Sequence, residues 1–209
     1  MAIVINGSGT VTGISVGGLP DGIVDAGTLA TNSVDSAELI DGSIDTSHFA
    51  SGAGGITEID TWRLHTSLTG DARPLTANLE RDDTTLQSFL GTGMTESDGE
   101  FTFPSTGHWQ ITGSFFIVYN GDSGYNVAGI EVSTDDGSSW TGNTAEGASF
   151  TVTGGTNTTS WVQYTMDVTD IVNTKVRFSL QSSDSESIQI YANSSSNRTA
   201  FQFLKLGDT

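Results

Sequence analysis

One stretch of alternating residues constrains the fold of this chain more than any other. Every second residue from Trp109 to Tyr119 is apolar or glycine. Successive side chains of a β-strand point to opposite faces of the sheet, so these residues would all lie on one face. The set consists of Trp109, Ile111, Gly113, Phe115, Ile117 and Tyr119. We therefore predict a central strand of a β-sandwich, with this face turned towards the core.

Other β-prone runs surround this strand and are separated by turns rich in glycine, serine and threonine. A further run, which contains Phe101 and Phe103, precedes the central strand. Together these runs predict about nine to ten strands, a number that suits a two-sheet jelly roll over residues 57–209. The runs are 59–67, 126–133, 139–141, 150–153, 161–168, 175–181, 188–192 and 199–206. Residues 69–98 are irregular, with possible short strands near 76–79 and 86–89. No helical period is found from residue 56 onwards, so the predicted class is all-β.

The sequence GEFTFPSTGHWQITGSFFI, which begins at Gly99, resembles a signature of one family of jelly rolls. Its F-x-x-P-x-x-G-x-aromatic pattern is similar to a strand pair in the complement-type, TNF-like heads, and Thr199–Asp208 fits the closing strand. The resemblance covers residues 57–209. It implies a compact homotrimer with aromatic residues near the threefold axis.

The stretch from Asp21 to Ala50 repeats with a period of ten residues. Units this short cannot bury their own apolar side chains, so they must stack on copies of themselves or on other chains. We predict a trimeric stalk over residues 21–50, whose buried positions are Val24, Leu29, Val34, Leu39, Ile44 and Phe49. Asp25, Asp35 and Asp45 would cap short turns; calcium binding is the alternative for these three carboxylates.

Residues 1–20 precede the repeat and contain two short β-prone runs around the turn-forming pair Asn6-Gly7. A lone hairpin is marginal in water, so we predict that this segment attaches to something outside itself; a disordered terminus is the alternative. The candidate anchoring residues are Ile3, Val4, Ile5, Val11 and Ile14. Residues 51–56, which begin SGAGG, predict a flexible hinge between stalk and head.

The segment GISVGGLPDGIVDAGTLATNSVDSAELIDGSID resembles the N-terminal part of virion fibre and appendage proteins of tailed phages, particularly marine ones. This resemblance covers about the first 50 residues and implies a virion protein, assembled in the host cytoplasm, whose residues 1–20 contact other virion structural proteins. The predicted function is a non-enzymatic homotrimeric fibre or spike with an outward head. A receptor- or glycan-binding module for host attachment and a capsid decoration protein are the alternatives.

The charge distribution limits the possible partners. The net charge is −18, and the first lysine or arginine is Arg63. Nucleic acid binding requires cations that neutralise phosphates, so we expect no nucleic acid partner. No apolar run approaches the length of a membrane span, and we expect no membrane insertion. Cysteine is absent, which excludes disulfides and thiolate metal sites.

The sequence offers little for catalysis. His48, His65 and His108 are scattered, without the spacing of metal ligands or of a catalytic pair, so we expect neither enzymatic activity nor a cofactor nor a metal site. Residues 133–140, STDDGSSW, match the S-x-D-x-G-x-[ST]-W Asp-box of sialidases. A propeller would need several copies, and this sequence has one. We interpret it as a hairpin brace in which Asp135 accepts backbone N–H bonds and Trp140 packs underneath.

If the head binds a host receptor or glycan, exposed aromatic residues near the ends of loops are the candidate contacts. The residues that fit this description in the sequence are Tyr119, Tyr125 and Trp140. Aromatic side chains with a polar group suit such surfaces because they combine a large apolar area with hydrogen bonding.

Overall fold

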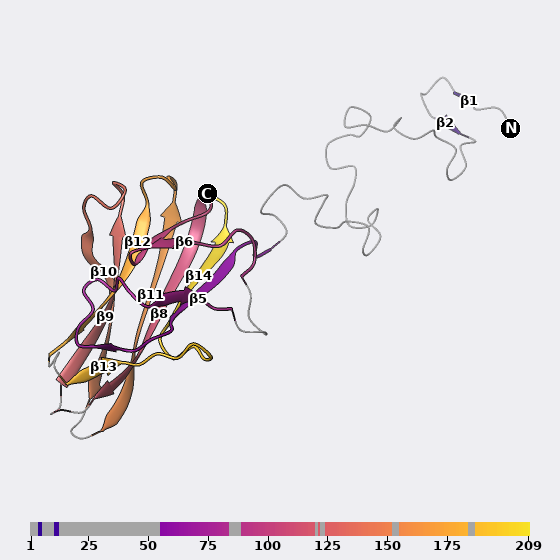
Figure 1. The fold of residues 1–209 in the computed structure, drawn as a ribbon. Helices are drawn as coiled ribbons and strands as arrows, with labels where there is room; N and C mark the ends of the chain where they lie inside the picture. The colour runs from indigo at the N-terminus through magenta and orange to yellow at the C-terminus, as the bar shows by residue number, and fades with distance from the viewer. Residues whose placement is uncertain are drawn as a thin grey trace. The chain divides into compact units, whose positions relative to one another are not determined.

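The computed structural model describes residues 4–5, 11–12, 55–83, 89–119, 121, 124–151, 155–183 and 187–209. The chain divides into two units, Met1–His48 and Phe49–Thr209, which we describe separately (Figure 1). All regular elements in the described ranges are β-strands, which confirms the all-β class. No helix long and apolar enough to cross a membrane was found among these residues.

The first unit contains a small hairpin. Strand β1 (Val4–Ile5) pairs antiparallel with β2 (Val11–Thr12), and Ile5 lies opposite Val11. The two apolar runs pair with each other, and residues 6–10 lie between them in the sequence. Ile3, Ile14, residues 51–54 of the hinge and the repeat lie outside the described residues. The role of the anchor therefore stays a prediction, as does the stalk formed by Val24, Leu29, Val34, Leu39, Ile44 and Phe49.

The second unit is a sandwich of two antiparallel sheets. The smaller sheet has the order β10-β9-β12-β7-β6. Its strands are β6 (Thr95–Ser97), β7 (Glu100–Thr102), β9 (Gly124–Ser133), β10 (Thr141–Thr151) and β12 (Lys175–Ser182). The larger sheet has the order β4-β13-β8-β14-β3-β5, with β11 paired to β8. Its strands are β3 (Ile59–Leu64), β4 (Leu68–Thr69), β5 (Leu79–Arg81), β8 (Gly107–Tyr119), β11 (Thr156–Val168), β13 (Ile188–Ile190) and β14 (Ala200–Gly207).

Strand β8 is the centre of the larger sheet, as its alternation predicts. It pairs with β11 along its whole length. Because a strand has only two edges, β14 and β13 share the other edge, β14 beside 108–114 and β13 beside 117–119. Every odd-numbered residue from Trp109 to Tyr119 is buried, and the even-numbered ones are half-buried on the opposite face.

Three expectations about the strands were wrong in detail. The runs around Phe101 and Trp109 are not a hydrogen-bonded pair: β7 pairs with β6 and β12 in one sheet, and β8 lies in the other. Pro104 and Gly107, the latter with φ of 138°, lead the chain from the first sheet to the second. Residues 150–153 do not form a separate strand, since β10 continues to Thr151. The described head contains twelve strands, because residues 68–97 add β4, β5 and β6.

Aromatic side chains from both sheets form the core. Phe101 and Phe178 of the smaller sheet meet Phe201 and Phe203 of the larger one. The ring centroids of Phe178 and Phe201 are 4.2 Å apart, and those of Phe101 and Phe203 are 4.9 Å apart. Gly113 of β8 makes room for this cluster, since a Cβ there would lie 3.1 Å from Phe178 Cδ1. Buried aromatic pairs contribute more than their area alone, so these contacts hold the sheets together.

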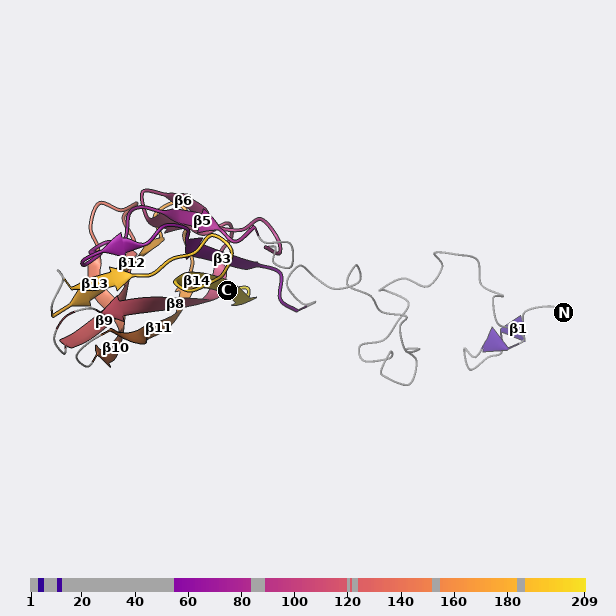
Figure 2. The same cartoon turned by 60° about the horizontal axis from the view of Figure 1, so that its bottom comes forward.

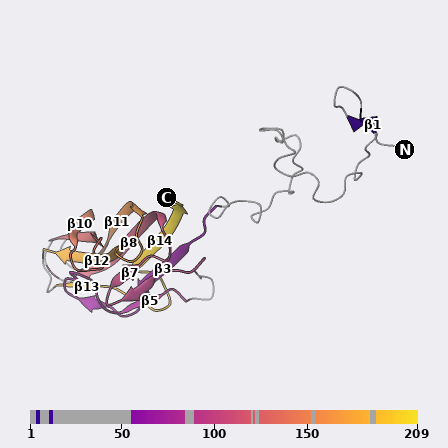
Figure 3. The same cartoon turned by 90° about the horizontal axis from the view of Figure 1, so that it is seen from above.

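The sandwich has two different edges (Figures 2 and 3). At one edge lie β5 and β6; at the other, β10 and β11 approach each other without pairing. The Oγ atoms of Ser149 and Ser160 are 2.6 Å apart across this second edge. A Cβ at Gly147 would lie 1.5 Å from the carbonyl oxygen of Trp161. Glycine is therefore required here by the closeness of the two backbones.

This contact gives a matched pair of substitutions in β10. Gly147→Ala should reduce the free energy of unfolding by about 1–3 kcal/mol, because β10 must move away from β11. Gly142→Ala is the control: a Cβ there meets nothing within 4 Å, and we expect a change within about 0.5 kcal/mol. Urea unfolding of both variants at equal protein concentration measures the difference. Equal midpoints would show that the close approach does not exist.

Candidate functional site

The three aromatic residues predicted to contact a ligand do not form one site. Tyr119 is fully buried, so its expected exposure was wrong: it occupies an odd-numbered position of β8, on the core face. Tyr125 is 48% exposed near the start of β9, and Trp140 is half-buried beyond the end of that strand. A ten-residue strand spans roughly 30 Å, so Tyr125 and Trp140 lie at opposite ends of the sandwich.

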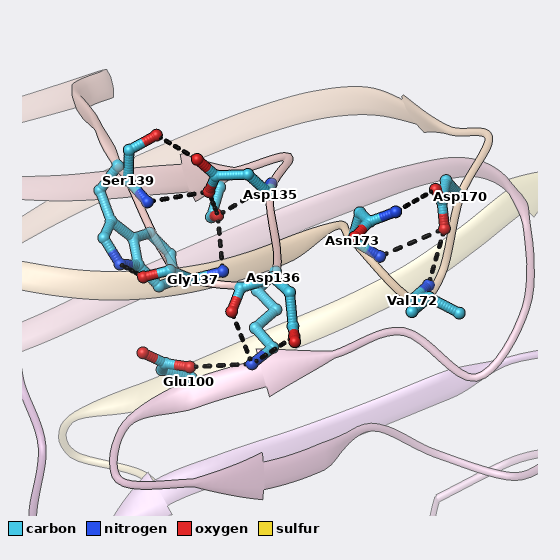
Figure 4. Close-up of polar contacts among 11 residues, drawn as sticks. Glu100, Asp135, Asp136, Gly137, Ser139, Asp170, Val172 and Asn173 are labelled. Carbon is cyan, nitrogen blue, oxygen red and sulfur yellow. Dashed lines mark hydrogen bonds and ion pairs between the residues drawn. The ribbon is translucent and has the colours of Figure 1, made fainter.

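The hairpin turn at residues 133–140 is braced by Asp135 (Figure 4). Its carboxylate accepts hydrogen bonds from the Ser139 amide at 2.8 Å, the Ser139 hydroxyl at 2.5 Å and the Ser133 hydroxyl at 2.8 Å. Hydrogen bonds from the Ser139 hydroxyl and amide, and then from Ser133, lower the pKa of Asp135. Gly137 has φ of 83°. These contacts confirm the interpretation of this motif as a hairpin brace.

Ion pairs and a second turn complete this end of the sandwich. Hydrogen bonds from Lys175 to Asp136 and then to Glu100 raise the pKa of the lysine (Figure 4). The guanidinium of Arg177 lies 4.1 Å from the ring centroid of Trp140. In the neighbouring turn, Asp170 accepts hydrogen bonds from the side chain and the backbone N–H of Asn173 and from the backbone N–H of Val172. These hydrogen bonds lower the pKa of Asp170. These polar groups bind one another, which indicates a structural role.

A different surface, which sequence reasoning missed, carries aromatic side chains away from the core. We call it the outer face: the even-numbered positions of β8 and the side chains of neighbouring strands that share their face. The rings of Phe116 and Tyr191 are 6.1 Å apart, and the Arg198 guanidinium lies 5.5 Å and 5.0 Å from their centroids. On β11, Trp161 is 54% exposed opposite Ser114. The run FFIV at 115–118 was the available signal, because it is apolar on both faces of the strand.

Carboxylates lie on another part of the outer face. Arg63 shares this face because it pairs with Ala200, which pairs with Ser114. Its side chain is 1% exposed, and its guanidinium contacts three carboxylates: Glu80 at 2.7 Å, Asp82 at 2.6 Å and Asp83 at 2.8 Å. Burial lowers the pKa of Arg63, but the hydrogen bond to Glu80 and the charges of Asp82, Glu80 and Asp83 raise it overall. One cation among three carboxylates leaves this region negative, and Asp83 is 82% exposed.

The aromatic part of the outer face carries the opposite charge. Among the described residues, Arg198 forms no ion pair, although five of the other cations do. The outer face therefore carries charges of both signs. The two regions adjoin, because the side chain of Asn197, next to Arg198 in the sequence, donates a hydrogen bond to Asp82 at 2.6 Å.

Neither family models nor curated proteins match this sequence. Solved structures do match its fold. The Eiger TNF structure from S. frugiperda is 9% identical with a TM-score of 0.55, and the match covers 74% of this chain and 95% of that one. A structure of murine APRIL at pH 5.0 is 6% identical with a TM-score of 0.48, covering 71% and 98%. The Eiger likeness shows the fold alone, and it confirms the TNF-like jelly roll.

The braced hairpin gives a prediction for the dependence of stability on pH. The pKa of Asp135 is lowered from its ordinary value of 3.8, so its contribution is complete above pH 3.8 and is lost as the pH falls through the lowered value. Asp135→Asn keeps the shape but removes the titration, and should reduce the loss of stability between about pH 5 and about pH 2. Urea unfolding at several pH values measures it.

The control for this experiment is Asp98→Asn. Asp98 is exposed, lies in the turn before β7 and has φ of 52°, a conformation that asparagine also tolerates. We expect this variant to keep the pH dependence of the unmodified chain. If both substitutions change the slope equally, the hydrogen bonds of Asp135 do not stabilise the folded chain.

Proposed function

We propose that this chain is a non-enzymatic structural protein of a phage virion, a homotrimeric fibre or spike. Residues 1–20 attach it to other virion proteins, the repeat at 21–50 joins three chains, and the TNF-like head faces outward. The protein is assembled in the host cytoplasm. The N-terminal resemblance and the ten-residue repeat support the virion role.

The outer face carries the proposal of a trimer. It exposes the ring of Trp161 and carries the half-buried Phe116–Tyr191 pair, on a sheet whose other face forms the core. Aromatic residues and arginine are enriched at protein interfaces. In the proposed ring, Arg198 of one copy would meet an exposed carboxylate such as Asp83 of the next copy. The proposed occupant of the outer face is thus a second copy of the chain.

A second candidate function is host attachment. Tyr125 and Phe150 are directly opposite each other on β9 and β10, and they are 48% and 65% exposed. They lie on the smaller sheet, so trimer formation through the outer face would leave them accessible. An exposed aromatic pair on an outward surface favours an adhesion module that contacts a host receptor or glycan.

Matched substitutions on the two sheets test the trimer. Trp161→Glu places a carboxylate in the proposed interface and should raise the concentration below which the trimer dissociates, because burying an unpaired charge costs several kcal/mol. The repeat also joins the chains in this proposal, so the mass is compared over a range of concentrations. Phe150→Glu makes the same change of charge on the smaller sheet and should leave the dissociation unchanged. Light scattering on both purified variants measures the mass at each concentration. A monomeric unmodified chain contradicts the trimer, and a Trp161→Glu variant that dissociates like the unmodified chain contradicts the proposed interface.

A further inference from the structure

A pocket lies at the edge of the sandwich formed by β5 and β6, on the opposite side from the β10–β11 contact. Its volume is about 340 Å³, at the lower end of the range for small-molecule sites. It is lined by Trp62, Arg81, Thr92, Gly93, Met94, Thr95 and Glu96. These residues come from both sheets and from the segment between β5 and β6. The pocket thus depends on the part of the chain that matched no sequence pattern.

Arg81 is held rigidly in this pocket. Its Nε lies 3.1 Å and 3.2 Å from the two carboxylate oxygens of Asp60, which is 1% exposed, and its Nη2 donates to Asp60 and to the Met94 carbonyl. The guanidinium lies 4.9 Å from the ring centroid of Trp62 and 4.6 Å from that of Phe89. No described residue accepts a hydrogen bond from Nη1, and the Arg81 side chain lines the pocket.

The wall of the pocket at residues 91–94 is also fixed. The Glu58 carboxylate accepts hydrogen bonds from the amides of Thr92 and Gly93, and Asp60 accepts one from the Met94 amide at 2.7 Å. Gly93 has φ of 75°, and a Cβ there would lie 2.9 Å from Asp60 Oδ2. Side chains and loop are therefore in place before any ligand arrives, which reduces the entropy cost of binding.

The lining defines the chemistry of a suitable ligand. Arg81 donates hydrogen bonds, and the hydroxyl groups of Thr92 and Thr95 donate or accept them. The Glu96 carboxylate accepts them, and its Oε1 already accepts one from the Gly99 amide at 2.7 Å. An anionic ligand does not suit this pocket. The charge of Arg81 is neutralised by Asp60, the Glu96 carboxylate would repel the anion, and the whole chain has a net charge of −18. A wholly apolar ligand would leave the charged groups without partners. The chemistry fits a neutral ligand with many hydroxyl groups and an apolar ring edge that packs on Trp62.

We propose that this pocket binds one neutral sugar ring of a saccharide. Sugar hydroxyls donate and accept hydrogen bonds, and the C–H groups of the ring suit an aromatic side chain. The site lies apart from the outer face, and the inference depends neither on the trimer nor on the virion role. It assigns saccharide recognition to Trp62, Arg81 and Glu96, a set distinct from the exposed pair of Tyr125 and Phe150.

Binding of simple sugars to the full chain tests this proposal. The probes are the methyl glycosides of glucose, galactose and mannose, and N-acetylglucosamine, with glucuronate as the anionic comparison. Saturation-transfer NMR at millimolar concentration should detect at least one neutral probe. Thr95→Tyr fills the pocket from an exposed position of β6 and should weaken that binding at least about tenfold, since the ring occupies the ligand's volume.

Two further variants separate a blocked pocket from a damaged fold. Thr69→Tyr makes the same change at an exposed position of β4, outside the pocket, and should leave the affinity unchanged. Arg81→Lys keeps a cation beside Asp60 but removes the donors at Nη1, and should also weaken binding. The proposal is overturned if no neutral probe binds, if glucuronate binds as well as they do, or if Thr95→Tyr and Thr69→Tyr have the same effect. The mass from light scattering is read separately, so failure here leaves the trimer proposal standing.

Discussion

The contact between aromatic side chains of the two sheets is the interaction on which the rest of the head depends. Phe101 and Phe178 pack against Phe201 and Phe203, and Gly113 leaves the space that Phe178 needs. This packing determines how the sheets face each other. At one edge it brings β10 against β11 so closely that only glycine fits at 147; at the other edge it leaves the pocket beside Arg81. Both edges are therefore consequences of one core.

The same sheet that supplies half of the core also supplies the outer face. In an ordinary two-layer sandwich the outward face of a sheet is polar. Here Phe116 of β8 contacts Tyr191 and Arg198, and Trp161 stands exposed on the neighbouring strand. A segment with apolar residues on both faces, such as 115–118, is typical of one that is covered on both sides. We infer that other subunits cover this face. The charged turn at Asp135 has a different role, since its hydrogen bonds stabilise the sandwich itself.

Much of the fold could be predicted from the sequence, because a period of two is a local signal: the alternation from Trp109 to Tyr119 identified the central strand and its buried face. The same pattern shows why Tyr119 was wrongly expected at the surface. Two things could not be predicted. The first is whether β7 pairs with β8 or lies in the other sheet, because this depends on contacts with strands that are distant in the sequence. The second is the pocket, because it depends on hydrogen bonds from the backbone of residues 92–94 to Glu58 and Asp60, and such contacts leave no pattern in the sequence.

The central claim is that the outer face lies between subunits, and distances between spin labels test it most directly. The chain has no cysteine, so single labels can be placed at Thr159→Cys, opposite Phe116, and at Ala148→Cys, on the smaller sheet. Dipolar spectroscopy on the full chain should show short distances between subunits and an immobilised label at 159, with longer distances and a mobile label at 148. Shorter distances at 148 than at 159, or no dipolar coupling at either position, would contradict it.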